Sequence, residues 1–230
     1  MSVAVASISV VIPVHNGEKY LAASIQSVLD QRHPDLEVLV VDNASTDASA
    51  SVVAAFPSVR CLRLERKGVS RALNHGIAHS QGSFLAFLDA DDLWAPHKLT
   101  AQLDVFLREP ATDIVFGQVR QFVSPELDDA ARAKLDVREE VMPGRVRGSL
   151  LIRRDSFDRV GPFEVDTNFA EFIDWYMRAQ DAGLREVMIP EVLMLRRIHG
   201  GNMSFTEQAR RVDYVRVLKR GLDRRRRGAE

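Results

Sequence analysis

Short runs rich in β-branched residues alternate with amphipathic stretches along residues 8–119. The runs are apolar at nearly every position, as strands buried on both faces of a parallel sheet are. The stretches between them place apolar residues at helical spacing. The pattern predicts five strands, with a helix after each of the first four. The strands are 8–14, 36–41, 59–64, 84–88 and 113–119, and the helices are 18–31, 48–56, 69–80 and 96–108.

The pattern of the remaining residues is less regular. Residues 124–140 hold six acids and three bases, which indicates a solvated helix or a loop. A strand is expected at 148–152, and a helix at 169–182 that ends at Gly183. Pro190 interrupts an extended segment at 187–198, and 206–222 reads as a basic amphipathic helix.

Strands that alternate with helices predict an α/β fold with a mainly parallel sheet. Right-handed crossovers then place the carboxyl ends of the strands at one edge, where α/β sheets bind ligands. Polar residues follow three of the predicted strands, at His15-Asn16, Asp42-Asn43 and Asp89 to Asp92. We therefore expect a binding site at this edge.

Composition excludes some classes of protein and favours others. The 230 residues include 31 Lys and Arg and 32 Asp and Glu, a net charge of −1. The apolar content excludes intrinsic disorder, and the balanced charge speaks against nucleic-acid binding. Cys61, read as a small core residue, permits no intrachain disulfide. With no signal peptide or membrane span in the pattern, we expect a cytoplasmic protein.

The segment Asp89-Ala90-Asp91-Asp92 places three carboxylates within four residues at the end of a buried strand. Like charges this close repel one another unless a cation or solvent compensates. Mg²⁺ or Mn²⁺ bound to a diphosphate takes such oxygen ligands. The alternative is an N-cap for the next helix, but one acid suffices for that role. The segment therefore predicts a divalent cation site.

The other two strand ends allow a ligand-binding and a structural interpretation. Asp42 and Asn43 could bond to a base or a ribose, or they could simply belong to a capped turn. His15 could stack on a base or be an ordinary turn residue. The lone Gly17 does not form a dinucleotide fingerprint.

Later polar residues also have two interpretations. Glu171 and Asp174 lie three apart, hence on one face of the predicted helix. They could provide a general base, or they could be solvated acids. His199 follows Arg196 and Arg197 and could meet a phosphate or a metal, or be structural.

The ordered set of motifs resembles the family-two inverting glycosyltransferases of the GT-A fold, over about residues 7–205. Its carriers are 10–16 (VVIPVHN), 40–47 (VVDNASTD), 68–77, 82–94, 96–99, 160–163 (VGPF), 197–199 and 202–204. The resemblance implies one Rossmann-like domain, 1–205, with a mainly parallel central sheet flanked by helices. It divides into a nucleotide-sugar half, 7–120, and an acceptor half, 121–205, and a basic helix and tail follow at 206–230.

The resemblance also implies roles for single residues. Asp91 would bind the metal, with His199 as a second candidate ligand, and Glu171 or Asp174 would act as general base. The residues expected at the nucleotide-sugar donor are Pro13, His15, Glu18, Asp42, Asn43, Asn74, Asp89, Ala90 and Arg197.

The chain departs from the family at two positions. Asn43 stands where the family usually has a second acid, and Phe172 stands where the usual base, an Asp, follows Glu171. Because phenylalanine cannot accept a proton, Glu171 or Asp174 must replace that base, or catalysis is weak.

The function expected from the resemblance is Mn²⁺- or Mg²⁺-dependent transfer, with inversion, of a sugar from a nucleotide diphosphate, a UDP-sugar, to an acceptor hydroxyl. The acceptor could be a carbohydrate, a lipid-linked sugar or a small molecule. One alternative is a catalytically degenerate sugar-nucleotide-binding protein. The other is a sugar-phosphate nucleotidyltransferase, which the loop 15–19 disfavours because it is not rich in glycine and arginine. The basic helix could pair with a second copy, as a homodimer, or touch a membrane peripherally.

Overall fold

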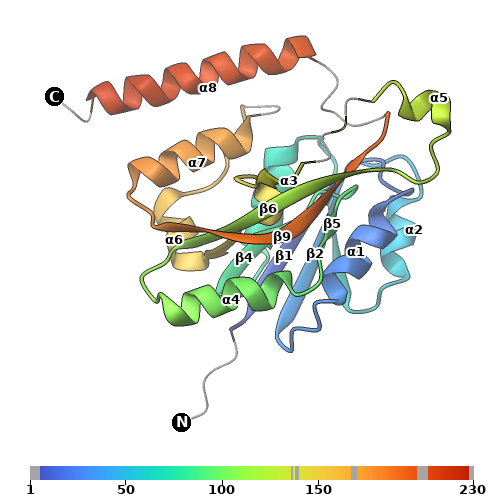
Figure 1. Cartoon of the computed structure of the whole chain (residues 1–230), viewed down its shortest axis with the longest axis horizontal. Coiled ribbons are helices and arrows are strands. Elements are labelled where there is room, and N and C mark those ends of the chain that lie inside the picture. Colours follow the sequence, from blue (N-terminus) through green and yellow to red (C-terminus); the bar gives the residue numbers. More distant parts are fainter. Residues whose placement is uncertain (1–5, 136, 138–139, 167–169, 201–206, 228–230) are drawn as a thin grey trace.

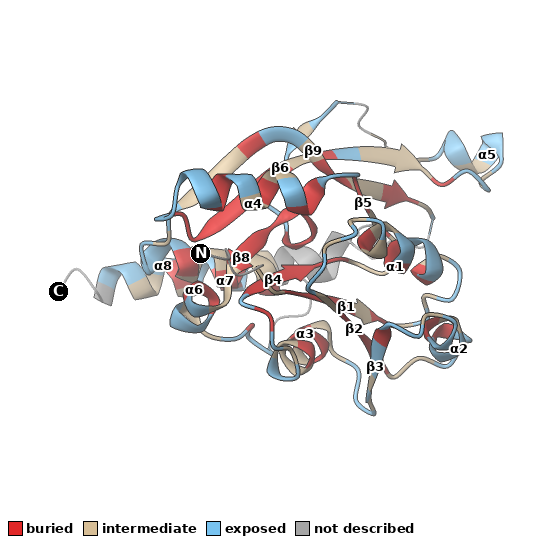
Figure 2. Ribbon diagram, turned by 90° about the horizontal axis from the view of Figure 1, so that it is seen from below, coloured by how far each residue is buried: buried red, intermediate tan, exposed pale blue. Residues whose placement is uncertain are grey.

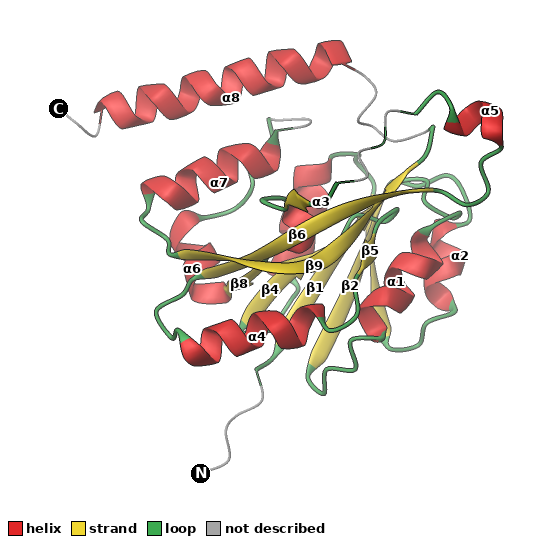
Figure 3. Ribbon diagram, viewed as in Figure 1, coloured by secondary structure: helices red, strands yellow, loops and turns green. Residues whose placement is uncertain are grey.

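One twisted sheet of nine strands forms the centre of the computed structural model, and helices cover both of its faces (Figures 1 and 3). The structure describes residues 6–135, 137, 140–166, 170–200 and 207–227, and the side chains of the last segment from Tyr214 to Arg226. The strands are β1 (Ile8–Val14), β2 (Leu36–Asn43), β3 (Val59–Leu64), β4 (Phe84–Phe87), β5 (Leu93–Trp94), β6 (Ile114–Val123), β7 (Met142–Pro143), β8 (Leu151–Arg153) and β9 (Glu186–Ile198). The helices are α1 (Leu21–Leu29), α2 (Ser49–Ala54), α3 (Val69–Ala78), α4 (Lys98–Arg108), α5 (Asp129–Arg132), α6 (Arg154–Val160), α7 (Glu171–Asp181) and α8 (Glu207–Arg227), with a 3₁₀ turn at Arg147–Ser149.

The first half of the sheet is parallel, as expected from the sequence. β1 pairs in parallel with β2 and β4, and β2 pairs in parallel with β3. The second half mixes directions, because β8 is antiparallel to both β4 and β6 while β9 is parallel to β6. The α/β fold class is confirmed, and the parallel pairing is concentrated at β3-β2-β1-β4.

Alternate residues of the strands supply two apolar layers, one on each face of the sheet. On β1, Val10 and Ile12 belong to the layer under α1 and α4, whereas Val11 belongs to the layer under α3, α6 and α7. Figure 2 shows the central strands buried and the outer helix faces exposed. The sheet is therefore covered on both faces, which explains why its strands read as continuous apolar runs.

Three of the sequence-based expectations that differ from the structure have a physical reason. Cys61 is exposed rather than in the core, because β3 is an edge strand on which only Val59 is buried. Pro190 does not interrupt β9, since pairing with β6 shifts register around it, from Met188 to Val192. The helix expected at 96–108 begins only at Lys98, because the backbone of His97 is left-handed, with φ of 63°, and so cannot belong to the helix.

The predicted basic helix is confirmed as α8, which packs against α7. Its expected first residue, Thr206, lies outside the described residues, as does the side chain of Val212. Within the described segments, no helix has both the length and the apolar composition that a membrane span requires.

The contribution of the apolar layer beneath α7 to stability can be tested at Trp175. Its side chain is fully buried, its ring stacks on Phe157 with 5.2 Å between centroids, and its Nε1 donates to the carbonyl of Gly161. We expect Trp175→Ala to lower the free energy of unfolding by about 3–5 kcal/mol, measured by urea denaturation. Leu107→Ala, at a side chain that is 70% exposed, should change it by less than about 0.5 kcal/mol. Equal effects of the two substitutions would contradict this account of the core.

Candidate active site at the carboxyl ends of the strands

The three polar strand ends converge, as expected. The Nδ1 atom of His15 lies 2.9 Å from the carbonyl oxygen of Asn43, which joins the ends of β1 and β2. The Oδ1 atom of Asn43 accepts a hydrogen bond from the backbone N–H of Gly68, 2.8 Å away. Asp42 is 2% exposed and accepts from the backbone N–H of Ser45. The turn interpretation of Asp42 is therefore confirmed, while the ligand-binding interpretation stays a prediction.

Pro13 and Glu18 lie at the same edge. Pro13 is partly buried near the end of β1. The carboxylate of Glu18 accepts a hydrogen bond from the backbone N–H of Ala48 at the start of α2, at 2.8 Å. The loops after β1 and β2 thus support each other, which holds this edge of the sheet in one arrangement.

The loop before α3 contributes a pocket that sequence reasoning missed. A hollow of about 230 Å³ is lined by Arg66, Lys67, Gly68, Val69, Ser70, Arg71 and Val165. Three cations therefore surround the amino end of a helix, which attracts anions. The Oγ atom of Ser70 is buried and has no hydrogen-bond partner among the described residues. The signal available in the sequence was the cluster of three bases around a glycine.

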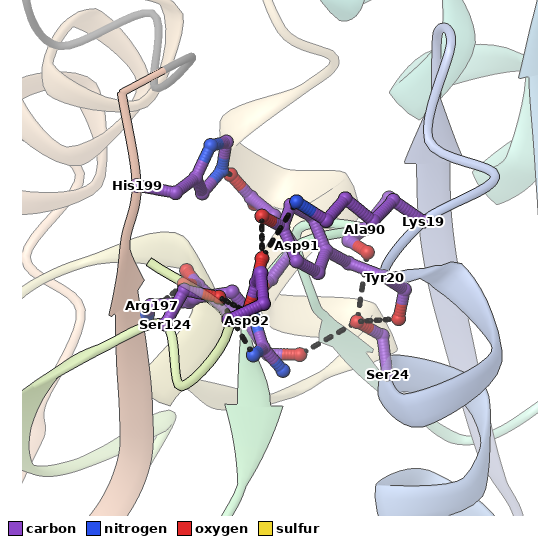
Figure 4. Close-up of polar contacts among 10 residues, drawn as sticks. Lys19, Tyr20, Ser24, Ala90, Asp91, Asp92, Ser124, Arg197 and His199 are labelled. Carbon is purple, nitrogen blue, oxygen red and sulfur yellow. Dashed lines mark hydrogen bonds and ion pairs between the residues drawn. The ribbon is translucent and has the colours of Figure 1, made fainter. Parts of the chain in front are cut away.

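The carboxylates of the acidic loop, Asp89 to Asp92, point to three different partners. Asp89 pairs with Arg147. Asp91 faces His199, and Asp92 accepts from the backbone N–H of Arg197 at 2.8 Å (Figure 4). Burial and the nearby charges of Asp91 and Asp89 raise the pKa of Asp92 well above its ordinary value. None of the three acids caps α4, whose N-cap residue is His97, so the capping alternative is wrong.

Two side chains hold the backbone of the acidic loop. The hydroxyl of Ser24 lies 2.8 Å from the carbonyl oxygen of Ala90 and 2.7 Å from that of Asp92. The Nε atom of Arg197 donates to the carbonyl oxygen of Asp91, at 2.9 Å. Ala90, which is expected at the nucleotide-sugar donor, is therefore held in place through its backbone carbonyl.

Arg197 itself is 7% exposed, and its guanidinium lies between the rings of Tyr20 and Phe122, 4.7 Å from each centroid. Sequence reasoning expected this arginine at the donor phosphates. In the structure its guanidinium contacts the two rings, the carbonyl oxygen of Asp91 and the hydroxyl of Ser124, so it supports the acidic loop.

Asp91 and His199 form the pair best suited to hold a metal. The Nε2 atom of His199 lies 3.2 Å from Oδ2 of Asp91, although 108 residues separate them in the sequence. Both side chains are partly accessible, with exposed fractions of 14% for His199 and 34% for Asp91. A carboxylate oxygen and an imidazole nitrogen fit Mn²⁺, which shares its remaining positions with phosphate and water. Among the described residues, no group of three acids, histidines or cysteines could hold a metal ion. A metal at Asp91 and His199 would therefore need phosphate or water as its further ligands.

The two acids of α7 point to different partners. Glu171 accepts from Arg147 Nη1 at 2.5 Å, and the same guanidinium contacts Asp89 through Nη2. Arg147 is buried; although burial alone lowers its pKa, the charges of Asp89 and Glu171 raise it above the usual range. Asp174 is 1% exposed and pairs instead with Arg178, at 2.9 Å, and with Arg224 on α8, at 3.2 Å.

Glu171 thus joins the acidic loop, while Asp174 joins α7 to α8. Sequence reasoning missed Arg147, because nothing in its neighbourhood distinguishes it from other arginines.

Phe172 stacks on Trp175 and Tyr176 in the core layer, with ring centroids 6.1–6.2 Å apart. Asn74 is expected at the nucleotide-sugar donor. In the structure its Nδ2 atom donates to the carbonyl oxygen of Phe163 at 2.8 Å, and its Oδ1 atom accepts from the backbone N–H of Phe163 at 3.0 Å.

Comparison with known proteins identifies the family. The model of glycosyl transferase family 2 matches residues 9–165, which include the acidic loop and Arg147. The chain belongs to glycosyltransferase family 2. The resemblance found in the sequence is thereby confirmed, and the mixed sheet described above is that of the GT-A fold.

Relatives and solved structures agree with this assignment. The UDP-Glc:alpha-D-GlcNAc-diphosphoundecaprenol beta-1,3-glucosyltransferase WfgD of Escherichia coli is 36% identical over 104 residues, 44% of this chain and 41% of that protein. S. aureus TarS 1-349 in complex with UDP-GlcNAc superposes with a TM-score of 0.69 at 21% identity, covering 87% of this chain and 61% of that one. The mannosyltransferase PcManGT of Pyrobaculum calidifontis, in complex with GDP-Man and Mn²⁺, gives 0.68 at 22% identity, covering 95% and 64%.

The chain spans only part of related proteins. It covers 32%, 66% and 42% of the lengths of matching glycosyltransferases from Nostoc, Rickettsia typhi and Bacillus subtilis.

Removal of Arg147 should be strongly destabilising. Arg147→Met leaves the buried Glu171 without its partner, and we expect a loss of about 3 kcal/mol in the free energy of unfolding by urea denaturation. Arg147→Met combined with Glu171→Gln should recover part of that loss, because the uncompensated charge is gone. Arg145→Met, which breaks the more exposed pair with Glu186, serves as control and should cost less than about 1 kcal/mol. Full additivity of the Arg147 and Glu171 substitutions would contradict the coupling.

Proposed function

We propose that the chain catalyses metal-dependent transfer of a sugar, with inversion, from a nucleotide diphosphate donor to an acceptor hydroxyl. One observation carries the proposal. The four-residue acidic loop contacts His199 through Asp91 and, through Asp89 and Arg147, the carboxylate of Glu171. A candidate cation-binding pair and a candidate base are thus held by one segment, as a displacement at a sugar carbon between a leaving diphosphate and an attacking hydroxyl requires.

Asp91 and His199 would hold Mn²⁺ or Mg²⁺. The cation, when bound, offsets the negative charge that develops on the departing nucleotide diphosphate. Arg197 bonds to the carbonyl oxygen of Asp91, and Ser24 bonds to those of Ala90 and Asp92 on either side, so the backbone that carries this carboxylate is held in place. The complex of PcManGT with GDP-Man and Mn²⁺ supports a metal site in this fold.

The nucleotide would lie along the ends of β1 and β2. His15, Asp42 and Asn43 line this edge, and Asn43 leads to the cationic pocket at the start of α3. We favour a UDP-sugar, because the amino group of Asn43, whose Oδ1 accepts from Gly68, can donate to a pyrimidine carbonyl, and TarS is known in complex with UDP-GlcNAc.

Glu171 would be the general base. Phe172 cannot take a proton, and Asp174 is enclosed by two arginines, Arg178 on α7 and Arg224 on α8. Arg147 contacts both Glu171 and Asp89, which holds the carboxylate of Glu171 beside the acidic loop. The acceptor oxygen forms its bond to the sugar as the bond to the diphosphate breaks, and the hydroxyl proton passes to Glu171. The relative WfgD is a glucosyltransferase whose acceptor is alpha-D-GlcNAc-diphosphoundecaprenol, which supports a sugar on a lipid diphosphate as the acceptor here.

A catalytically degenerate sugar-nucleotide-binding protein is the second candidate. The packing of Phe172 at the usual base position and the ion pair of Glu171 favour it. Binding of donor and metal without turnover is the property that distinguishes this candidate from an active transferase.

Asp91→Asn and His199→Asn test the metal pair. We expect each to weaken Mn²⁺-dependent UDP binding at least about tenfold by calorimetry, because each removes one of two protein ligands. Asp104→Asn, an exposed acid on α4, should leave binding unchanged. UDP binding that is equally tight without Mn²⁺, or in Asp91→Asn, would overturn the metal site.

Glu171→Gln tests the base. We expect kcat of sugar transfer to fall about 10²–10⁴-fold while UDP binding stays within about twofold, since proton transfer alone is lost. Asp174→Asn should leave kcat within about twofold in folded protein. An undiminished rate in Glu171→Gln would refute the assignment. Binding of UDP and Mn²⁺ by the unaltered protein, without turnover of carbohydrate, lipid-linked or small acceptors, would establish the second candidate.

A further inference from the structure

An exposed apolar stripe runs along the outer side of α8. Val215, Leu218 and Leu222 are 67%, 51% and 57% exposed, and they recur at the i, i+3, i+7 spacing of one helix face. Three of the seven large exposed apolar side chains among the described residues thus fall within eight positions of one helix. Their concentration requires an explanation that scattered surface residues do not.

The opposite side of α8 is already used for packing. Val217 is fully buried, and a Cβ on Gly221 would meet the methyl group of Met177 on α7 at 2.0 Å. Arg224 completes this side through its ion pair with Asp174. The helix therefore has its core-facing side on α7, and the stripe points away from the protein.

Basic residues flank the stripe. Between Tyr214 and Arg226 the helix carries six bases and one acid, Asp223. Arg224 and Arg225 pair with acids of α7, whereas Lys219 and Arg226 border the stripe and share a shallow hollow with it. An apolar stripe edged by cations matches a surface that is apolar inside and negatively charged at its boundary.

A second copy of this chain matches the stripe less well. Two copies of α8 that met along their stripes would bring their bases together, and like charges repel at such contacts. The surface of an anionic bilayer has the complementary charge and accepts the apolar side chains at its boundary.

We propose that α8 docks the protein on an anionic lipid surface, lying flat with Val215, Leu218 and Leu222 in the boundary between headgroups and acyl chains. Figure 1 shows α8 as the outermost element beyond α7, at the opposite end of the view from the start of β1 at Ile8. The carboxyl end of β1 and the candidate site therefore face the end that α8 occupies. Docking through α8 brings the candidate site to the side nearest the lipid.

Vesicle flotation of the full chain tests this docking, with neither nucleotide nor metal present, so the result is independent of the proposed transferase activity. We expect the chain to float with vesicles of equimolar phosphatidylcholine and phosphatidylglycerol, and to dissociate as salt is raised. Flotation with pure phosphatidylcholine should be weak. Equal binding to both vesicles, or none to the anionic ones, would overturn the proposal.

Substitutions separate the apolar from the electrostatic contribution. Leu218→Ser combined with Leu222→Ser should reduce partition to anionic vesicles at least about tenfold. Lys219→Gln combined with Arg226→Gln should reduce it about 25-fold, since each basic residue near an anionic surface contributes about fivefold. Leu107→Ser, an exposed leucine on α4, is the matched control and should bind as the unaltered chain does.

Two further outcomes decide the remaining questions. Should the leucine variant fail to fold, as judged by circular dichroism, the Lys219 and Arg226 variant still tests the docking, since both side chains are exposed. Light scattering tests whether a second copy of the chain, rather than a lipid surface, covers the stripe. A dimer that the leucine substitutions dissociate, in a chain that does not float, would assign the stripe to a second copy and refute the lipid surface.

Discussion

Three carboxylates within four residues must be kept apart at the end of β4, and much of the site follows from this constraint. Each acid has a partner from a distant part of the chain: Arg147 for Asp89, His199 for Asp91, and the backbone of Arg197 for Asp92. These partners come from the segment before β8 and from the end of β9. The acidic loop therefore fastens the irregular second half of the chain to the parallel first half.

The ion pairs of the second half form a connected series. Arg147 links Asp89 to Glu171 at the first turn of α7, and Asp174, one turn later, links α7 to Arg224 of α8. Neighbouring turns of one helix thus connect the acidic loop on one side with an outer helix on the other. The chain has Phe172 between these acids, packed in the core layer. Glu171 is thus the carboxylate of α7 that reaches the acidic loop, through Arg147.

Much of the parallel half could be predicted from the sequence, because its elements depend on local periodicity. Strands buried on both faces must be apolar throughout, and the helices between them must be amphipathic. The convergence of His15, Asn43 and the acidic loop followed from strand direction alone. Cys61 was misplaced because an edge strand and a central strand can share one apolar pattern, and only neighbours along the sheet distinguish them.

The sequence by itself determined the fold class, the family and the edge of the sheet where polar groups gather. Tertiary structure decided which of those groups meet. Asp91 and His199 are 108 residues apart, and Arg147 contacts Glu171 across 24, separations at which no local pattern predicts a contact. Glu171 and Asp174 share a helix face by spacing, yet only the packing of α7 against both the acidic loop and α8 separates their partners. The physical reason is that hydrophobic periodicity is a property of one element, whereas an ion pair depends on where two elements are placed.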